Sequence, residues 1–365
     1  MAALPDSRHA TVSAIWQAWE ARAGNEPDRA YLGASEIGHS CERWLWLRFR
    51  WAVAQNWPGR MLRLFDRGQR EEAAVVADLR SIGCQVWDVD GDGKQFRYTA
   101  VSGHFGGGMD GVVLGLPEAP KTAHLLEVKT HNGKSFAALS KHGVASHKPQ
   151  HFMQMQVYMA MADLDRAVYV AVNKDNDEIH VERIERDRTN AERIFVRASQ
   201  IIFADTPPLG VSESPEWWEC KTCHAHALCH GTAAPRVNCR TCVHSTPVDD
   251  GAWHCAWHNS AIDIGTQRTG CPEHRHMPAL LSRWAEAVDA DEGANVIKFR
   301  NKLTGAEFDQ PGYSSAEITA CDDKACIGDA GVDVLKVECT AKIVAPQRPH
   351  DWTGLTDDLP WEVTA

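Results

Sequence analysis

Hydrophobic positions recur in two alternating patterns along residues 10–205. One pattern spaces apolar residues three and four positions apart, as in an amphipathic helix, and the other is a short apolar or alternating run typical of a strand. The first pattern predicts helices over residues 10–28, 40–51, 61–83, 150–164 and 190–205. The second predicts strands over residues 84–90, 123–130, 166–174 and 178–187, and two more strands, broken by glycines, within 96–116. We expect Ser40 to cap the second helix and Gly83 to end the third. Alternating helices and strands predict an α/β fold.

The pattern changes after Pro207. Residues 215–280 are crowded with Cys, His and Trp, and residues 281–365 are acidic and irregular, with short strand-like runs such as NVIKF and DVLKVECTAKIV. These shifts predict three parts: an α/β core over residues 1–232, a Cys/His-rich module over 233–280 and an acidic C-terminal region over 281–365.

Charge and composition narrow the class of protein only a little. The formal net charge of −11 argues weakly against a nucleic-acid partner, but residues 41–80 hold eight Arg against five acids, which leaves room for a basic face. No apolar run is long enough to cross a membrane, and the first residues lack the pattern of a secretory signal. We therefore expect a cytoplasmic protein without membrane contacts.

The stretch HLLEVKT places an acid and a base on one face of a predicted strand. Glu127 and Lys129 are two positions apart, so their side chains point the same way. Asp110 begins the preceding strand, and a short connection would bring it to the same spot. Two carboxylates suit Mg²⁺, and a neighbouring Lys can orient a water or stabilise charge on a phosphate. The alternative is a solvated Glu–Lys pair on a half-exposed strand.

The surroundings of this pair resemble the PD-(D/E)XK nuclease superfamily, in particular its RecB-like and lambda-exonuclease-like (YqaJ-type) branch. The resemblance spans residues 30–205 and implies a restriction-endonuclease-like core, which is a mixed sheet flanked by helices. Glu71 is an alternative to the matching residue Glu72, and Gln156 is an alternative to the matching residue Gln154. The residues that carry the resemblance are Gly68, Glu72, Asp110, Glu127, Lys129, Gln154 and Tyr158.

The resemblance also implies a function. The chain would be a Mg²⁺- or Mn²⁺-dependent exonuclease of phage or prophage DNA recombination, hydrolysing phosphodiester bonds of linear DNA at ends or single strands. Asp110, Glu127 and Glu72 would hold the metal, Lys129 would activate the nucleophile, and Gln154 and Tyr158 would complete the site. A recombination or single-strand-binding partner and an oligomer are compatible with this reading.

A first group of cysteines follows the predicted core. Cys220, Cys223 and Cys229 form C-x2-C-x5-C, and Cys41 stands alone before the core. This layout resembles the iron–sulfur nucleases of the same superfamily, which implies a 4Fe–4S cluster that ties the entry of the chain to its exit. The alternative is zinc bound by the three later cysteines and one of His224, His226 and His230.

A second group reads as a zinc module. Cys239 and Cys242 form C-x2-C, and Cys255 and Cys271 follow at x12 and x15. So small a segment lacks an apolar core of its own and needs a staple. Three histidines compete for the later ligand positions: His254, His258 and His274.

Two further features have a structural and a functional interpretation. The stretch CERWLWLRFRW interleaves three Arg with three Trp, which can grip a DNA strand or can be core packing. The acidic end LTDDLPWEVTA is a disordered terminus or a docking peptide. A rival function is therefore a non-catalytic DNA-binding or assembly protein that uses the zinc module and the Arg-rich helix, and a third is an iron–sulfur electron carrier.

Overall fold

The computed structural model describes residues 9–24 and 27–334. The acidic end, Cys339 and most of the last strand-like run lie outside these residues. Within them, no helix combines the length and the hydropathy needed to cross a bilayer.

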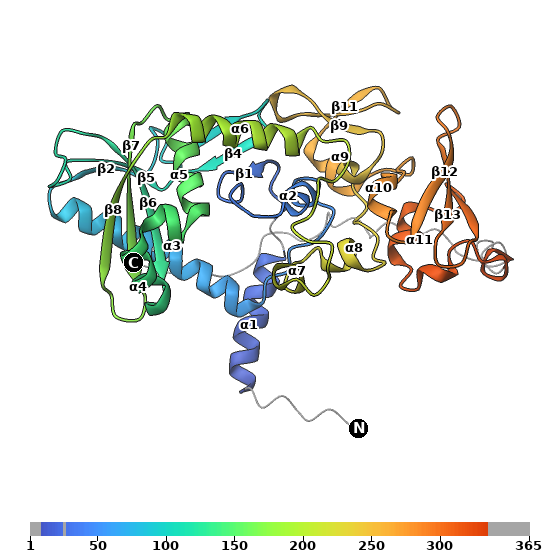
Figure 1. The fold of residues 1–365 in the computed structure, drawn as a ribbon, viewed down its shortest axis with the longest axis horizontal. Coiled ribbons are helices and arrows are strands. Elements are labelled where there is room, and N and C mark those ends of the chain that lie inside the picture. The colour runs from blue at the N-terminus through green and yellow to red at the C-terminus, as the bar shows by residue number, and fades with distance from the viewer. Residues whose placement is uncertain (1–8, 25–26, 335–365) are drawn as a thin grey trace, which may run out of the picture.

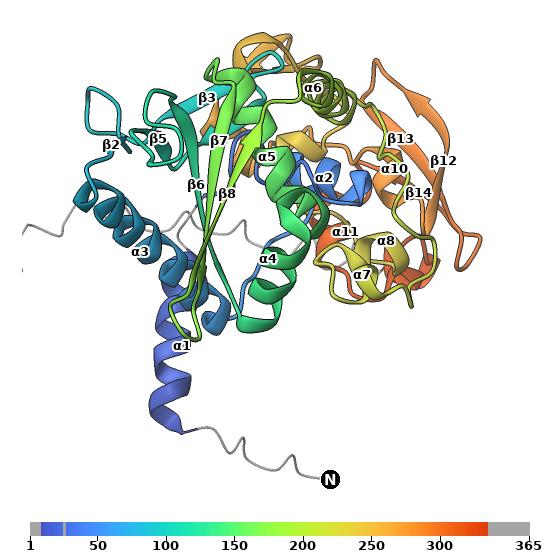
Figure 2. The same ribbon diagram turned by 60° about the vertical axis from the view of Figure 1, so that its left-hand side comes forward.

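A five-stranded mixed sheet forms the centre of the N-terminal half, in the order β2-β5-β6-β7-β8 (Figure 2). β6 and β7 run parallel, and the other neighbours run antiparallel. β6 and β7 are buried along most of their length, which explains their nearly continuous apolar sequences. The strands are β2 (Gln85–Trp87), β5 (Gly111–Leu114), β6 (His124–His131), β7 (Arg166–Asn173) and β8 (Ile179–Glu185).

Helices cover both faces of this sheet. On one face, Val75 and Val76 of α3 (Gly59–Ser81) pack in a cluster with Leu126 and Val128 of β6. On the other face lie α4 (Gly133–His147), α5 (Pro149–Met161) and α6 (Arg188–Ile202), and α1 (Ala10–Ala23) contacts α3 (Figures 1 and 2). The expected mixed sheet flanked by helices is therefore present.

Two local expectations need correction. Residues 96–116 contain three strands and not two: β4 (Phe105–Gly108) pairs with both β1 (Leu32–Gly33) and β3 (Arg97–Ala100) in a separate small sheet, while β5 joins the main one. The cap of α2 (Glu42–Phe49) is Cys41 and not Ser40, since the Cys41 sulfur accepts from the Trp44 amide. Ser40 donates instead to Glu219, 179 residues away.

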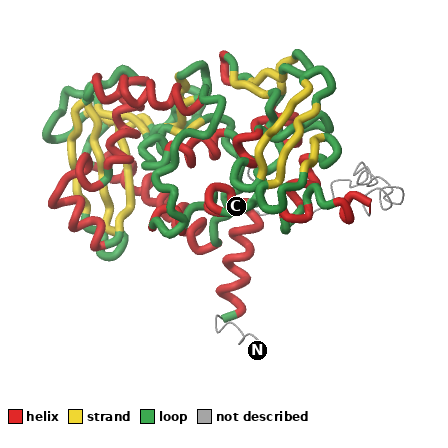
Figure 3. Tube along the Cα trace, turned by 45° about the vertical axis from the view of Figure 1, so that its right-hand side comes forward, coloured by secondary structure: helices red, strands yellow, loops and turns green. Residues whose placement is uncertain are grey.

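Residues after 205 form short elements and two more three-stranded sheets. The segment 285–310, expected to be irregular, is a regular antiparallel sheet in the order β12-β13-β14. Strands accordingly gather at both ends of the molecule (Figure 3). The helices are α7 (Trp218–Lys221), α8 (His226–His230), α9 (Ile264–Thr269), α10 (Pro278–Leu281) and α11 (Ser315–Ala320), with short 3-10 turns η1 (Cys239–Thr241), η2 (Asp249–Gly251) and η3 (Lys324–Cys326). The strands are β9 (Ser245–Pro247), β10 (Trp253–Cys255), β11 (Ser260–Ile262), β12 (Ala285–Asp291), β13 (Val296–Asn301) and β14 (Glu307–Gln310).

The Arg- and Trp-rich helix is an interior element. Trp46, Trp51 and Arg50 are almost fully buried, so the interpretation of these three as DNA contacts is wrong. The Arg50 guanidinium donates to the carbonyl oxygens of Arg240 and Ala204, and both of its aromatic neighbours belong to the core. Their interleaved pattern reflects a buried cation held between aromatic rings.

One apolar core spans the first two predicted parts. Leu45 of α2 and Met155 of α5 belong to the same cluster as Trp253 and Leu280 of the Cys-rich region. Residues 281–327 contribute a separate cluster, built around Trp284 and Phe299. The sheet and the Cys-rich region therefore share their packing, whereas the C-terminal sheet has a core of its own.

Candidate active site

The middle of β6 carries the two side chains that the sequence placed on one face. Leu126 and Val128 point to α3, which leaves Glu127 and Lys129 on the α5 side. Glu127 is fully buried, and Lys129 keeps about 29% of its side chain exposed. The Lys129 ammonium group donates to Glu127 Oε1, so the acid and the base form an ion pair across one pleat.

Asp110 joins this pair from the adjacent strand. It directly precedes β5, whose Gly111 is in register with Leu126, so its side chain is beside the centre of β6. Its Oδ2 accepts from the Val128 amide at 2.9 Å and lies 3.8 Å from Lys129 Nζ. Two carboxylates and one amine therefore converge on one point, although Asp110 lies 17 and 19 positions before Glu127 and Lys129 in the sequence.

Helix α5 supplies the next contact. Gln154 Nε2 donates to Glu127 Oε2 at 3.1 Å, so each oxygen of this carboxylate has a different partner. The rival Gln156 donates to the Glu185 carbonyl and accepts from the Asp187 amide, which makes it a structural link between α5 and β8. Geometry therefore distinguishes the two glutamines that the sequence left open.

Tyr158 lies one turn further along α5 and packs against β4. A Cβ added to Gly107 would lie 2.4 Å from the Tyr158 hydroxyl, so this close approach requires glycine. Burial, together with the charges of Glu127 and Asp110, raises the pKa of Tyr158, so the phenol stays protonated.

Glu72 reaches the same acids from α3. Its pKa is raised to about 7 by burial and by the charge of Asp110, against the lowering effect of Lys129. It forms no hydrogen bond or ion pair with another described residue, and Gly68, one turn earlier, has open space beside it. Among the two neighbouring glutamates, it is Glu72 whose charge is felt at the site.

Burial is the main electrostatic influence on the acids, and repulsion between them adds to it. Burial raises the pKa of Glu127 to about 7, Asp110 and Glu72 add to the rise, and Lys129 opposes it. For Lys129, burial lowers the pKa, but Glu127 and Asp110 outweigh it and the pKa rises. The ammonium is thus firmly charged, and one cation balances up to three carboxylates.

The donor set fits a hard divalent cation in its chemistry. Oxygen ligands from carboxylates with open positions are what Mg²⁺ prefers, and the excess of negative charge favours a second cation beside Lys129. Across residues 9–24 and 27–334, however, no group of three or more His, Cys, Asp or Glu side chains is already arranged around a metal position. Metal would therefore have to draw Glu72 and Asp110 closer to Glu127.

Three side chains next to the acids escaped the sequence analysis. His131 Nε2 and His151 Nδ1 lie 2.9 and 2.8 Å from the hydroxyl of Tyr169, which is the β7 partner of Glu127 in the sheet register. Only the parallel pairing of β6 with β7 brings Tyr169 to this place. The one sequence signal was His131, which continues the i, i+2 series of Glu127 and Lys129.

The four cysteines of the first group meet around one small cavity. Cys41 at the start of α2 lies with Cys220, Cys223 and Cys229 in its lining. Burial raises the pKa of the Cys229 thiol to about 11, and the proximity of Cys223 and Cys41 contributes. The chain thus brings together thiols from segments that are almost 180 residues apart in sequence.

The second group of cysteines also shares one cavity. Cys239, Cys242, Cys255 and Cys271 line a space of about 260 Å³. Among the competing histidines, His274 is engaged by Ser315 and by the Asn238 carbonyl, whereas His258 Nε2 lies 3.7 Å from the Cys271 sulfur. All eleven cysteines within the described part of the chain are free thiols.

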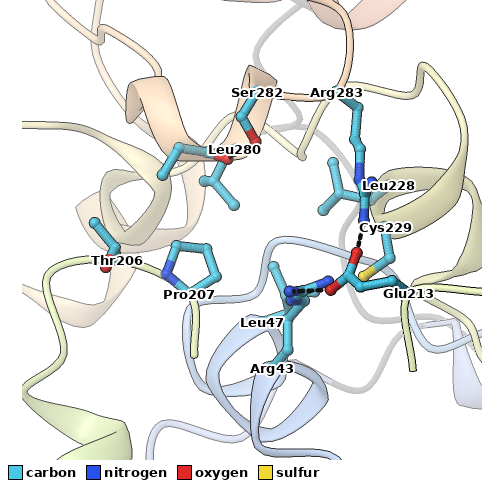
Figure 4. Close-up of a pocket in the computed structure, with 11 residues that line it drawn as sticks. Arg43, Leu47, Thr206, Pro207, Glu213, Leu228, Cys229, Leu280, Ser282 and Arg283 are labelled. Atoms are coloured by element: carbon cyan, nitrogen blue, oxygen red, sulfur yellow. Dashed lines mark hydrogen bonds and ion pairs between the residues drawn. The ribbon is translucent and has the colours of Figure 1, made fainter. Parts of the chain in front are cut away.

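A larger cavity, of about 380 Å³, is separate from the acid cluster. Figure 4 shows Arg43 and Arg283 approaching Glu213 from two sides. Their guanidinium nitrogens lie 2.9 and 2.7 Å from its two carboxylate oxygens. Hydrogen bonds from Arg283 and Arg43 lower the pKa of Glu213. Glu213 forms an ion pair with each of the two arginines. These two ion pairs link α2, the segment before α7 and the segment after α10.

Solved structures provide partial likenesses. The chain is similar to the alkaline exonuclease LHK-Exo of Laribacter hongkongensis, in complex with dAMP, at 21% identity and a TM-score of 0.36, over 51% of this chain and 90% of that one. It is similar to the protein SSO0001 at 15% identity and a TM-score of 0.38, over 60% and 96% of the two chains. A phage-related exonuclease of Haemophilus somnus 129PT is similar at 18% identity and a TM-score of 0.28, over 36% and 66%. No protein-family model and no curated protein matches the chain.

Proposed function

We propose that the protein is a metal-dependent DNA exonuclease that hydrolyses phosphodiester bonds. The observation that carries this proposal is the convergence of Asp110, Glu127 and Lys129, with Gln154 on the second oxygen of Glu127. The sequence resemblance to lambda-exonuclease-like nucleases supports DNA ends as the substrate and phage or prophage recombination as the setting.

Each residue has a role that follows from its surroundings. Asp110, Glu127 and Glu72 would hold Mg²⁺ or Mn²⁺, which supplies Lewis-acid polarisation of the phosphate and an acidified water. Lys129, charged and partly exposed, orients the nucleophilic water or stabilises charge developing on the phosphate. Gln154 fixes the rotamer of Glu127 so that its carboxylate does not swing toward solvent.

The test is degradation of end-labelled linear DNA in Mg²⁺, Mn²⁺ or EDTA, with closed circular DNA to separate exonuclease from endonuclease activity. We expect cleavage of the linear form only in the presence of metal, and a loss of at least about 100-fold in Lys129→Ala, the scale of a transition-state donor. Lys134→Ala is the matched control, because Lys134 is an exposed lysine of α4 outside the acid cluster. Full activity of Lys129→Ala would defeat the role of Lys129, and DNA binding without degradation in any metal would favour the rival DNA-binding protein.

For the cofactors, we propose a 4Fe–4S cluster on Cys41, Cys220, Cys223 and Cys229. A tetrahedral zinc site needs four ligands within about 2.3 Å of one point, whereas a cluster accepts thiolates that stand further apart. The wide separation of Cys41 from the other three in sequence suits a staple between α2 and α7.

The prediction is a brown protein with absorbance at roughly 400 nm that disappears in Cys41→Ala, together with a fall in thermal stability. Cys84→Ala is the control, since Cys84 is a lone core thiol that faces the Gly115 carbonyl. A colourless wild type that contains zinc in place of iron would favour the alternative metal.

For the second cysteine group, we propose zinc held by Cys239, Cys242, Cys255 and Cys271, with His258 as the alternative to one of them. Their shared cavity supports this set. Elemental analysis of anaerobically purified protein should give about one zinc per chain, and a value near zero would contradict it.

A further inference from the structure

A continuous chain of hydrogen bonds begins beside the acid cluster and ends at α4. His151 Nδ1 faces the Tyr169 hydroxyl at 2.8 Å, and the same hydroxyl faces His131 Nε2 at 2.9 Å. His131 Nδ1 then meets Ser135 Oγ at 3.1 Å, and Ser135 Oγ meets His147 Nε2 at 3.4 Å. Five side chains from β6, β7, α4 and α5 thus form one network that the proposed chemistry has not used.

The inner end of this chain borders the proposed catalytic residues. Tyr169 stands opposite Glu127 in the parallel ladder, and His131 follows Lys129 on the same face of β6. His151 precedes Gln154 by one turn of α5, so both side chains project to one side of that helix. His151 therefore faces the same space as the ion pair of Glu127 and Lys129.

The ring of His151 has one nitrogen to spare. Its Nδ1 is occupied by Tyr169, whereas its Nε2 has no hydrogen-bond partner among residues 9–24 and 27–334 and is not one of their fully buried, unpartnered polar atoms. Burial, and then the charge of Lys129, His131 and Lys148, lowers the pKa of His151 to about 3, so the imidazole is neutral. A neutral imidazole carries one N–H, and the network decides on which nitrogen it sits.

The group that binds to His151 Nε2 determines which partner donates in each hydrogen bond of the network. The hydroxyl of Tyr169 has a single proton, so one flanking histidine must donate to it and the other must accept from it. A phosphodiester offers only acceptor oxygens at its charged face. Binding of such an oxygen at His151 requires the proton on Nε2, and then His151 Nδ1 accepts from Tyr169, His131 Nε2 donates to Tyr169, and His131 Nδ1 accepts from Ser135.

We propose that His151 is a DNA-binding residue of the site, whose Nε2–H donates to a phosphodiester oxygen, and that Tyr169, His131 and Ser135 are positioning residues that fix this tautomer. The ligand is the sugar–phosphate backbone of the bound strand, and the inference rests on the proposed nuclease function. An uncharged donor here adds no further cation to a site whose charge balance already depends on Lys129 and a metal.

Two substitutions of His151 separate substrate binding from a structural role. The amide of Gln reaches the position of Nε2, whereas the amide of Asn reaches only that of Nδ1. His151→Gln therefore keeps the donor to DNA and loses the bond to Tyr169, and His151→Asn does the reverse. The measurement is kcat and KM on end-labelled linear DNA in Mg²⁺, with thermal unfolding of each variant recorded beside it.

We expect KM to rise about tenfold or more in His151→Asn and His151→Leu, the scale of one hydrogen bond to a charged group. The rise in KM should be clearly smaller in His151→Gln than in His151→Asn. In Tyr169→Phe it should be intermediate, because His151 keeps its Nε2 but no longer has a partner that fixes its proton there. In all of them kcat should change less than KM. His142→Gln is the control, because His142 is an exposed residue of α4 outside the network.

The outcomes are distinguishable. If wild-type protein cleaves DNA and His151→Leu has an unchanged KM, or if His151→Asn retains more affinity than His151→Gln, the assignment of His151 is overturned while the nuclease stands. If wild type cleaves no DNA in any divalent metal, the nuclease proposal falls, and the assignment of His151 falls with it.

Discussion

Glu72 stands out among single residues because burial and Asp110 act on its carboxyl group in the same direction. Both raise its pKa, to about 7 from an ordinary value of 4.5. A group whose folded pKa is raised contributes stability that is complete below pH 4.5 and is lost as the pH rises through 7. Without metal, the ionised carboxylate of Glu72 therefore destabilises the folded protein at neutral and alkaline pH.

This balance predicts that Glu72→Gln stabilises the metal-free protein in a pH-dependent way. In EDTA, the gain in unfolding free energy over wild type should be small at pH 5 and should reach about 1–2 kcal/mol at pH 8.5, after allowance for screening by solvent. Denaturant unfolding at the two pH values measures it. Added Mg²⁺ should reverse the order, because it binds the folded wild type more tightly than the variant. Equal differences at pH 5 and 8.5 would show that the Glu72 carboxyl titrates normally.

At the scale of elements, the local sequence pattern was enough to predict β6 and its two flanking helices. β6 reads as a strand from its apolar start and its i, i+2 pair, and α3 and α5 read as helices from their spacing. The pattern failed where pairing decides the structure. Two-residue β1 exists only because β4 lies beside it, and α4, with a kink at Gly143, has too weak a pattern to be seen.

The same limit applies to the candidate site. Asp110, Glu127 and Lys129 could be grouped from the sequence because a short connection joins their strands. Choosing Gln154 over Gln156 required the rotation of α5, and finding Tyr169 and His151 required the register of β6 with β7. Non-local register is not encoded in any window of the sequence.

The close approach of α5 to β4 gives a prediction at this scale. Gly107→Ala should cost about 1–3 kcal/mol of unfolding free energy, because the new methyl group meets the Tyr158 hydroxyl and φ is +159°. Displacement of α5 would also move Gln154, so DNA cleavage should fall beyond the loss of folded protein. In a Tyr158→Phe background the same substitution should cost less, though not nothing, since the backbone strain remains. Equal costs in both backgrounds, from denaturant unfolding of the four proteins, would rule out this contact as the cause.

At the scale of the molecule, the question is whether the sheet and the Cys-rich region fold as one unit. Their apolar residues share a cluster, and Arg240 links them from the inside. Its guanidinium donates to Gln267 of the Cys-rich region and to the carbonyl oxygens of Phe49 and Ala30 in the N-terminal part. It also packs over Trp51 and Trp253. Burial, and then the neighbouring Arg50, lowers the pKa of Arg240 to about 9.

Arg240→Lys therefore tests the unity of the fold. A lysine ammonium cannot span three acceptors in a plane, so it leaves buried carbonyl oxygens unsatisfied, at a cost of about 3 kcal/mol or more. If the two parts are one unit, calorimetry will show one transition at lower temperature, and heating will release metal from the second cysteine group in parallel with the loss of DNA cleavage. Arg193→Lys, an exposed arginine of α6, should leave the transition where it is. In the contrary outcome, the Cys-rich region of Arg240→Lys unfolds first and the sheet still melts at the wild-type temperature. Arg240 would then join two units that fold separately.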